Sequence, residues 1–227
     1  MENSVNFRTD MADERVDEYK RVNNLTYLDG VEVIQNEKNN ITTTVVKITN
    51  ENGEKSLSKK IGDYITIETK DIKYLEDKEE NELVKIVSDE LKNLIKGKEK
   101  SNEKSSILIV GLGNEYITPD ALGPKVVKNI NITRHVLNIA GDIANSNQRS
   151  VCAIMPGVLG TTGIETFEIV KSVVDKIKPD IVIAIDSLAS SSMHRIGNTI
   201  QLSDTGITPG AGVRNKREGL NYESLNV

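Results

Sequence analysis

The sequence predicts an α/β protein with a three-layer α/β/α core, a mainly parallel sheet and a small N-terminal antiparallel β module. Short, continuous apolar runs at 107–111, 151–157 and 180–187 are typical of parallel strands buried on both faces. Helical patterns at 119–130 and 164–178 lie between these runs, which is the order of a parallel sheet with crossover helices. Alternating β-branched runs in the first half indicate antiparallel strands.

We divide the 227 residues into three parts. Residues 1–29 form a polar arm, in which Asp10 is placed to cap a short helix that runs through about Val22. Residues 101–227 form the α/β core. Residues 30–100 hold the β module and then an amphipathic helix, with strands expected at 31–35, 41–49 and 63–69, turns containing Asn and Gly between them, and the helix at 76–97.

Composition and charge limit the classes of function. Sequence-independent binding of nucleic acid requires a concentrated basic surface, which a net charge of −5 does not favour. No run approaches the ~18 apolar residues of a membrane span, and the polar N-terminus lacks a signal-peptide core. We therefore expect no direct nucleic-acid partner, no membrane partner and a cytoplasm-like, reducing compartment. Cys152, the single cysteine, lies in an apolar run and is expected to be a core residue.

The stretch GLGNEYITPDALGP at 111–124 permits two interpretations. A dinucleotide-binding loop would need a third glycine where Tyr116 stands, and a P-loop would need Gly-Lys-Ser/Thr at its end. Alternatively, Thr118 caps a helix that begins at Pro119, which places Asp120 in the first turn. This motif alone favours an aspartate that complements the helix dipole.

A second aspartate changes that interpretation. Asp186 directly follows the apolar run IVIAI, where an unpaired carboxylate is costly to bury and is rarely placed for packing. Asp120 and Asp186 are therefore expected at the same edge of the predicted sheet. Paired carboxylates can share a proton and activate water for attack on an amide. Our hypothesis makes Asp120 the general base and Asp186 the protonated partner at the carbonyl oxygen or leaving amine.

Glycine-rich loops are expected near the same edge. Gly157, Gly160 and Gly163 are predicted at turn positions before a helix, and their amides either stabilise an oxyanion or only connect elements. Thr208 and Gly210 belong to a further loop of this kind. No H-E-x-x-H motif or Cys/His cluster marks a metal site, and no G-x-S-x-G marks a serine hydrolase, so we expect no cofactor.

Several blocks together resemble the germination protease family of bacterial endospores, which are atypical aspartic endopeptidases. The similarity extends from the N-terminal arm to the last residues and includes ungapped blocks of ten or more. The matching blocks are RTDMA (8–12), GLGNEYITPDALGP (111–124), ITRHV (132–136), PGVLGTTGIET (156–166), KPDIVIAIDSLAS (178–190) and TIQLSDTGITPGAGVRNKRE (199–218).

The resemblance implies a function. Members of this family degrade the small acid-soluble proteins that coat DNA in the spore core, and they assemble as homotetramers. They are made as zymogens that remove a short N-terminal segment by self-cleavage. The family's catalytic aspartates map onto Asp120 and Asp186, and its processing bond maps onto Asp10–Met11, so that residues 1 to about 10 are a propeptide. Its α/β fold is distantly similar to hydrogenase-maturation endopeptidases, which bind nickel through acidic residues.

The sequence also departs from the family pattern. Met11 replaces Leu at the processing site, and Thr208 and Arg214 replace a His and a Gly in a loop that could affect specificity. The family continues well beyond Val227, so we expect the core to be truncated at its C-terminus. Two alternatives stay open at this point: a catalytically incompetent relative that serves as a binding or assembly subunit, and a nickel-dependent maturation-type endopeptidase.

Overall fold

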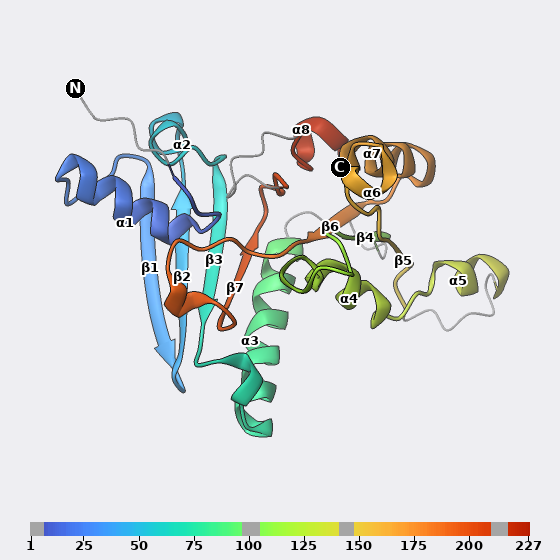
Figure 1. Cartoon of the computed structure of the whole chain (residues 1–227), viewed down its shortest axis with the longest axis horizontal. Helices are drawn as coiled ribbons and strands as arrows, with labels where there is room; N and C mark the ends of the chain where they lie inside the picture. Colours follow the sequence, from blue (N-terminus) through green and yellow to red (C-terminus); the bar gives the residue numbers. More distant parts are fainter. Residues whose placement is uncertain (1–6, 97–104, 141–147, 210–217) are drawn as a thin grey trace. The chain divides into compact units, whose positions relative to one another are not determined.

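The computed structural model describes residues 7–96, 105–140, 148–209 and 218–227, which fall into two compact units (Figure 1). Among the described residues, the first unit combines 7–96 with 188–205, and the second combines 105–140 and 148–187 with 206–209 and 218–227. The segment 188–205 therefore belongs with the N-terminal part of the chain, although it is distant in sequence. Each unit has its own sheet and its own hydrophobic core.

The sheet of the first unit is antiparallel, as predicted. In the described residues its order is β1-β2-β3-β7, with β1 (Val31–Lys38), β2 (Ile41–Ile48), β3 (Gly62–Glu68) and β7 (Thr199–Ser203). Asn39 and Asn40 join β1 to β2, and both have positive φ, which suits a two-residue hairpin loop. The sequence did not predict β7, which pairs with β3 from far along the chain.

The connection from β2 to β3 contains a helix where only a turn was predicted. Helix α2 (Glu51–Leu57) begins after Asn50, whose side chain accepts hydrogen bonds from the amides of Asn52 and Gly53. Such an Asn cap supplies partners for amides that the first turn leaves unpaired. Leu57 at the end of α2 is fully buried and fixes the short helix to the core.

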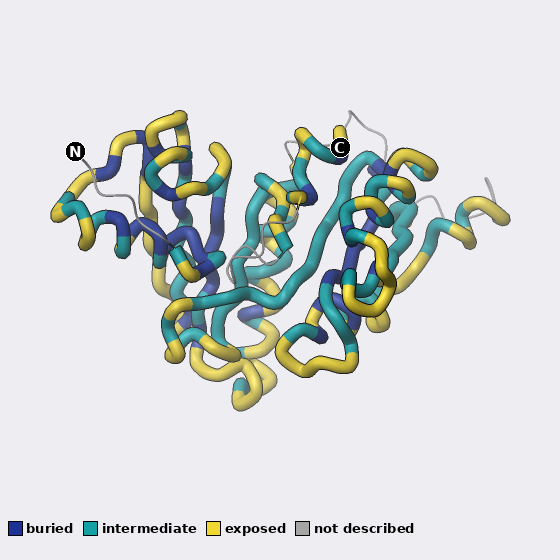
Figure 2. Tube along the Cα trace, turned by 45° about the horizontal axis from the view of Figure 1, so that its top comes forward, coloured by how far each residue is buried: buried dark blue, intermediate teal, exposed yellow. Residues whose placement is uncertain are grey.

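Helices cover both faces of this sheet. Because neighbouring strand residues point to opposite faces, Tyr64 packs with one core cluster and Ile65 with another. Helix α1 (Ala12–Asn23) contributes to the first cluster, and α3 (Asp77–Lys96), which follows the short η1 turn (Ile72–Tyr74), contributes Leu83 to the second. The burial pattern of these strands and of α1 is visible in Figure 2. The helix predicted at 76–97 is confirmed.

The start of α1 differs from its prediction. The residue before the helix is Met11, whose own side chain makes no capping hydrogen bond. The carboxylate of Asp10 instead accepts a hydrogen bond from the amide of Ala189, at 3.3 Å. The prediction that Asp10 caps this helix is therefore wrong, because a partner distant in sequence holds its side chain.

Two basic side chains of the first unit are withdrawn from water, Arg15 fully and Lys59 in part. Arg15 is buried and donates to the carbonyl oxygens of Thr9, Leu57 and Ser58 at 2.9–3.0 Å. The Lys59 ammonium lies 4.7 Å from the centre of the Tyr64 ring. Burial, and then the nearby Arg15 charge, lower the pKa of Lys59 to about 7, against smaller raising effects of Asp10 and Asp13. This amine is therefore readily neutralised in the folded state.

The second unit has the predicted parallel sheet. Its described strands are ordered β5-β4-β6, with β4 (Ile107–Gly111) between β5 (Val151–Ile154) and β6 (Ile181–Ile185). Leu108 and Val110 of β4 pack against Val170 and Val174 of α7 (Thr166–Ile177).

Helix α4 (Leu122–Lys128) lies against the other face of β4, where Gly111 meets Val127. The remaining short helices are α5 (Arg134–Ala140), α6 (Leu159–Thr162), η4 (Met193–Arg195) and α8 (Tyr222–Leu225). With α7 on one face of the sheet and α4 on the other, the predicted three-layer arrangement is confirmed.

The start of α4 rests directly on the carboxyl ends of β4 and β6. A Cβ atom on Gly123 would lie 2.4 Å from the carbonyl oxygen of Leu112 and 2.5 Å from that of Ile185. A Cβ atom on Gly111 would lie 2.4 Å from the carbonyl oxygen of Gly123. These contacts are with backbone atoms, which cannot move aside as a flexible side chain can. The two glycines therefore set the distance between helix and sheet.

Substituting Gly123 by Ala should disturb this packing. The added methyl group must push α4 away from the sheet, so we expect a loss of about 1–3 kcal/mol in the free energy of unfolding. Gly160→Ala is the matched control, because a Cβ atom there meets nothing within 4 Å. Denaturant unfolding measures both variants. Equal stability of the two variants would contradict the close approach of α4.

The pKa of Lys59 predicts a dependence of stability on pH. Between about pH 7 and the ordinary lysine pKa of 10.5, the unfolded chain holds a proton that folded Lys59 has lost, so the free energy of unfolding rises with pH in that window. Below that window the folded protein carries the full penalty of a buried charge. Lys59→Met should therefore raise the free energy of unfolding by roughly 1–3 kcal/mol near pH 6, with a smaller gain near pH 10.

The exposed Lys55 of α2 provides the control for this experiment. Its ammonium pairs with Glu51 at the surface, so Lys55→Met should have little effect at either pH. Thermal or urea unfolding across the pH range measures the difference between the variants. A gain for Lys59→Met that is the same at every pH would show that its amine is not the titrating group.

Candidate active site

Asp120 and Asp186 belong to segments that leave neighbouring strands at one edge of the parallel sheet. Asp186 directly follows β6, and Asp120 ends the loop that follows β4. The pairing of Gly111 with Ile185 brings the carboxyl ends of these strands into register. The amide of Leu112 donates to the carbonyl oxygen of Ile185 at 2.8 Å, which joins the two segments one residue beyond the sheet.

The loop before α4 holds the carboxylate of Asp120. The amide of Asn114 donates both to Asp120 Oδ2 at 2.8 Å and to the Asp120 carbonyl oxygen at 3.0 Å. The Asn114 side chain in turn accepts from the amide of Tyr116 at 3.0 Å. Asp120 is thus fixed by its own loop, which closes on itself between Asn114 and Asp120.

The local structure around Asp120 corrects one prediction. Thr118 does not cap the helix: Thr118–Asp120 form a 3₁₀ turn (η2), Ile117 precedes this turn, and α4 begins only at Leu122. The carboxylate of Asp120 is therefore bound to the loop amide of Asn114 and not placed in the first turn of α4. Sequence propensities suggested the cap, but the closed loop determines where the helix begins.

Gly113 is the residue that permits this closure. Its φ of 104° lies in a region that favours glycine. A Cβ atom at this position would lie 2.0 Å from the carbonyl oxygen of Asp120 and 3.0 Å from its Oδ1. Both the backbone conformation and the lack of space therefore require glycine directly beside the aspartate.

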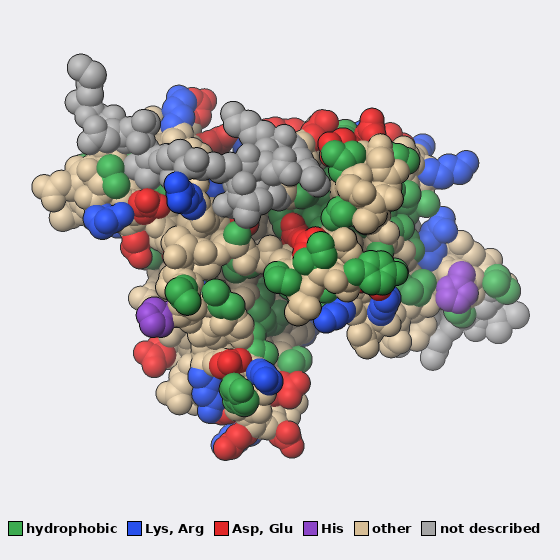
Figure 3. Space-filling view, in the orientation of Figure 1, with side chains coloured by type: hydrophobic (Ala, Val, Ile, Leu, Met, Phe, Trp, Pro, Cys, Tyr) green, Lys and Arg blue, Asp and Glu red, His purple; other side chains and the backbone are tan. Residues whose placement is uncertain are grey.

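The carboxylate of Asp186 is also bound by a main-chain amide. The Ser187 N–H donates to Asp186 Oδ1 at 2.8 Å, and the residue is half-buried. Around the same edge, large apolar side chains are exposed on the loops that follow β4 and β5, and hydrophobic side chains are visible over this unit in Figure 3. These exposed side chains are Tyr116, Ile117, Leu122, Met155 and Ile164. Exposed apolar side chains that gather on one surface are typical of sites that bind another protein or a peptide.

The glycine-rich loop after β5 forms a short helix. Gly157 and Gly163 have φ values of 74° and 70°, as turn positions require, whereas Gly160 lies inside α6. The Gly163 amide donates to the carbonyl oxygen of Leu159 and ends α6. That amide is thus used within the helix, which favours a connecting role over an oxyanion-binding role for Gly163.

Of the second predicted loop, only the beginning is described. Thr208 follows Ile207, which forms an isolated antiparallel bridge with Leu220. Thr208 lies close to Gly219: a Cβ atom added to Gly219 would lie 3.0 Å from Thr208 Oγ1. Gly210 lies outside the described residues, as does Arg214.

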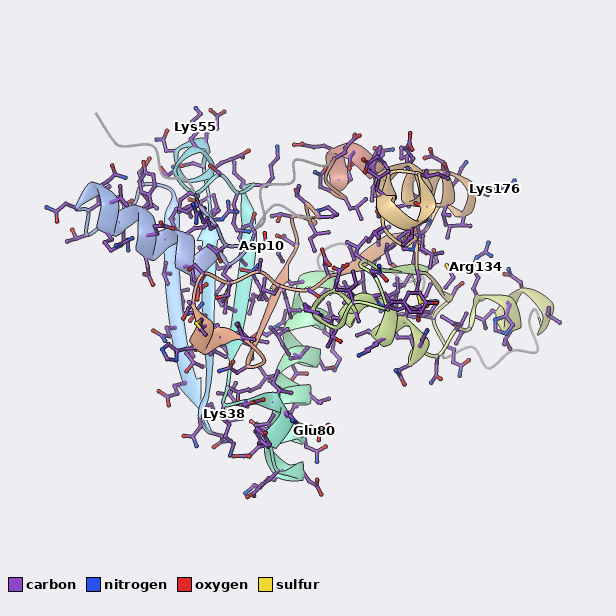
Figure 4. The ribbon with its side chains drawn as sticks, viewed as in Figure 1. Asp10, Lys38, Lys55, Glu80, Arg134 and Lys176 are labelled. Atoms are coloured by element: carbon purple, nitrogen blue, oxygen red, sulfur yellow. The ribbon has the colours of Figure 1, made fainter. Side chains whose placement is uncertain are left out.

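The predicted processing site, Asp10–Met11, lies in the first unit (Figure 4 labels Asp10). Met11 has no exposed surface, and the amide of Asp10 donates to the carbonyl oxygen of Ala189 at 2.8 Å. Sequence reasoning missed the residues that surround this bond, among them Gln201 and Arg15.

Within the described ranges, no three His, Cys, Asp or Glu side chains gather as they would around a metal ion. No helix in the same ranges is long and apolar enough to cross a membrane.

Comparison with known proteins identifies the family. The family model described as "Germination protease" matches residues 7–227. The germination protease of Clostridium tetani is 45% identical over 98% of this chain and 68% of its own length, and that of Clostridium perfringens strain SM101 is 47% identical over 98% and 67%. That of Priestia megaterium is 42% identical over 97% and 60%. The chain therefore belongs to the germination protease family and is a peptidase.

Proposed function

We propose that this chain is an endopeptidase that initiates the degradation of small acid-soluble, DNA-binding spore proteins during germination, in the spore core. It is made as a zymogen that cleaves its own Asp10–Met11 bond, and it works as a homotetramer without a cofactor. The observation that carries the catalytic part is the pairing of β4 with β6, since Asp120 and Asp186 leave the same edge of these neighbouring strands. Family membership supports the protein substrate.

In this mechanism, Asp120 accepts a proton from a water molecule whose oxygen attacks the carbonyl carbon of the peptide bond. Protonated Asp186 donates a hydrogen bond to the developing oxyanion and then transfers its proton to the leaving nitrogen. The C–N bond breaks, and a carboxyl group and an amine are formed. The Leu112–Ile185 hydrogen bond supports the pairing of the two aspartates, because it keeps their segments in register.

The loop that closes on Asp120 supports the role of general base. The amide of Asn114 binds Oδ2 and limits rotation of the carboxylate, so that Oδ1 keeps one direction toward a water molecule. The exposed apolar side chains on the neighbouring loops offer contacts to a protein substrate. Because that substrate is a protein and not DNA, the enzyme needs no basic surface, and its net charge of −5 is compatible with the proposal.

Replacing either aspartate tests the pair. Asp120→Asn and Asp186→Asn each remove a proton-transfer group, so cleavage of a small acid-soluble spore protein should fall by at least about 10²–10⁴-fold. Self-processing should stop in both variants, whereas the unchanged chain should give a mature N-terminus at Met11. Gel analysis of the substrate and N-terminal sequencing of the enzyme measure the two effects.

Asp175→Asn is the matched control for these variants. Asp175 is exposed on α7 of the same unit and pairs with Lys171, so this substitution should leave cleavage nearly unchanged. Near-normal activity of Asp120→Asn or Asp186→Asn would exclude the catalytic pair. No cleavage by the unchanged chain at any pH would instead favour the binding or assembly subunit, and a mature N-terminus other than Met11 would move the processing site.

A further inference from the structure

Residues Thr9 and Asp10 are bound to the main chain of Ala189. The Ala189 carbonyl oxygen accepts hydrogen bonds from the Asp10 amide at 2.8 Å and from Thr9 Oγ1 at 3.2 Å. The Ala189 amide donates to Asp10 Oδ2 at 3.3 Å. Both main-chain polar groups of Ala189 are thus bound by the N-terminal segment. Ala189 follows Asp186 by three residues in the sequence.

The side chain of Gln201 holds the Asp10–Met11 bond from β7. Its Nε2 donates to the carbonyl oxygen of Asp10 at 3.1 Å, and its Oε1 accepts from the amide of Ala12 at 2.8 Å. The Asp10 carbonyl is the group that water must attack during the proposed processing. Thr9 and Met11, on either side of Asp10, have no exposed surface. In this conformation the bond is therefore shielded from attack.

Arg15 fixes the same segment from its other side. Its Nε and Nη2 donate to the carbonyl oxygen of Thr9 at 3.0 and 2.9 Å, while Nη1 donates to Leu57 and Ser58. The guanidinium is buried, so it needs these acceptors to remain charged in the interior. Thr9 is therefore part of what stabilises a buried cation, and its removal would leave Arg15 without two of these hydrogen bonds.

We propose that residues Thr9–Ala12 are a latch: they shield the Asp10–Met11 bond, and cleavage of this bond frees the chain between Asp186 and Ala189. The proposal rests on the proposed processing of this bond. Hydrolysis adds OH to the Asp10 carbonyl carbon and H to the Met11 nitrogen as the C–N bond breaks. A neutral peptide unit becomes an α-carboxylate and an α-ammonium, and these charges favour hydration over a buried position.

The freed part of the chain has a defined limit. Glu14 lies after the processing bond and remains in the mature chain, where Oε2 accepts from the amide of Ser191 at 2.9 Å and Oε1 from Ser190 Oγ at 2.6 Å. The latch therefore releases Ala189 but leaves Ser191 bound. Faster exchange at Ala189 alone would therefore indicate release of the latch, whereas faster exchange at both Ala189 and Ser191 would indicate general loosening of the first unit.

Amide hydrogen exchange tests the latch before cleavage. In the uncleaved chain carrying Asp120→Asn to prevent self-processing, Gln201→Glu replaces the donor to the Asp10 carbonyl oxygen with a carboxylate oxygen. Two acceptor oxygens then face one another, so the segment should open more often. The Asp10 amide, bound to Ala189, and the Ala12 amide, bound to the side chain of residue 201, should therefore exchange about five- to ten-fold faster. Gln35→Glu, on the exposed part of β1, is the matched control and should change neither amide. Unchanged exchange in a folded Gln201→Glu variant would overturn the latch.

Thr9→Val gives a second test if Gln201→Glu does not fold. It keeps the shape of the side chain but removes the hydrogen bonds of Oγ1 to Met11 and Ala189. In the chain with Asp120 intact, both variants should process themselves faster than Gln35→Glu, because the bond is exposed more often. Slower processing would overturn the proposal and would make Gln201 a group that positions the bond for cleavage.

The final comparison follows cleavage itself. After complete cleavage at Asp10–Met11, by self-processing or by an added Asp-specific protease, the Ala189 amide should exchange faster while the Ser191 amide stays protected. Protection of Ala189 equal to that of the uncleaved chain would overturn release. If no variant processes itself, the proposed function fails, but the exchange data and the added protease still test the latch independently.

Discussion

The contact on which the second unit depends is the close approach of α4 to the ends of β4 and β6. Gly111 and Gly123 allow it, because any side chain at either position would meet a backbone oxygen. Gly113 permits the loop between strand and helix to close, and the Asn114 amide of this loop binds the carboxylate of Asp120. The packing of α4 and the direction of the Asp120 side chain thus depend on positions without side chains.

The first unit uses a different kind of constraint. Its N-terminal segment is held by polar contacts. Arg15 donates hydrogen bonds to three carbonyl oxygens, and Ala189 and Gln201 bind the residues beside the proposed processing bond. Buried polar groups of this kind stabilise the fold only while each has a partner. A segment held in this way is stable when intact and sensitive to one cut, which is a useful property in a zymogen.

Local patterns in the sequence predicted most of the elements but fewer of their connections. Continuous apolar runs predicted β4, β5 and β6, and both aspartates were expected after the right strands. Strand β7 was missed because TIQLS carries little apolar signal and its partner β3 lies over 130 positions earlier. The caps assigned to Asp10 and Thr118 were wrong because Ala189 and the closed Asn114 loop, which no local propensity reveals, determine those positions.

The central claim is that one aspartate of the pair is ionised while the other is protonated. The most direct measurement is the pH dependence of kcat/KM for cleavage of a protein substrate by the unchanged chain. The pair predicts a bell-shaped profile, since the rate must fall when Asp120 gains a proton and also when Asp186 loses its own. A rate that falls only on the acid side and stays constant as the pH rises would contradict a protonated Asp186.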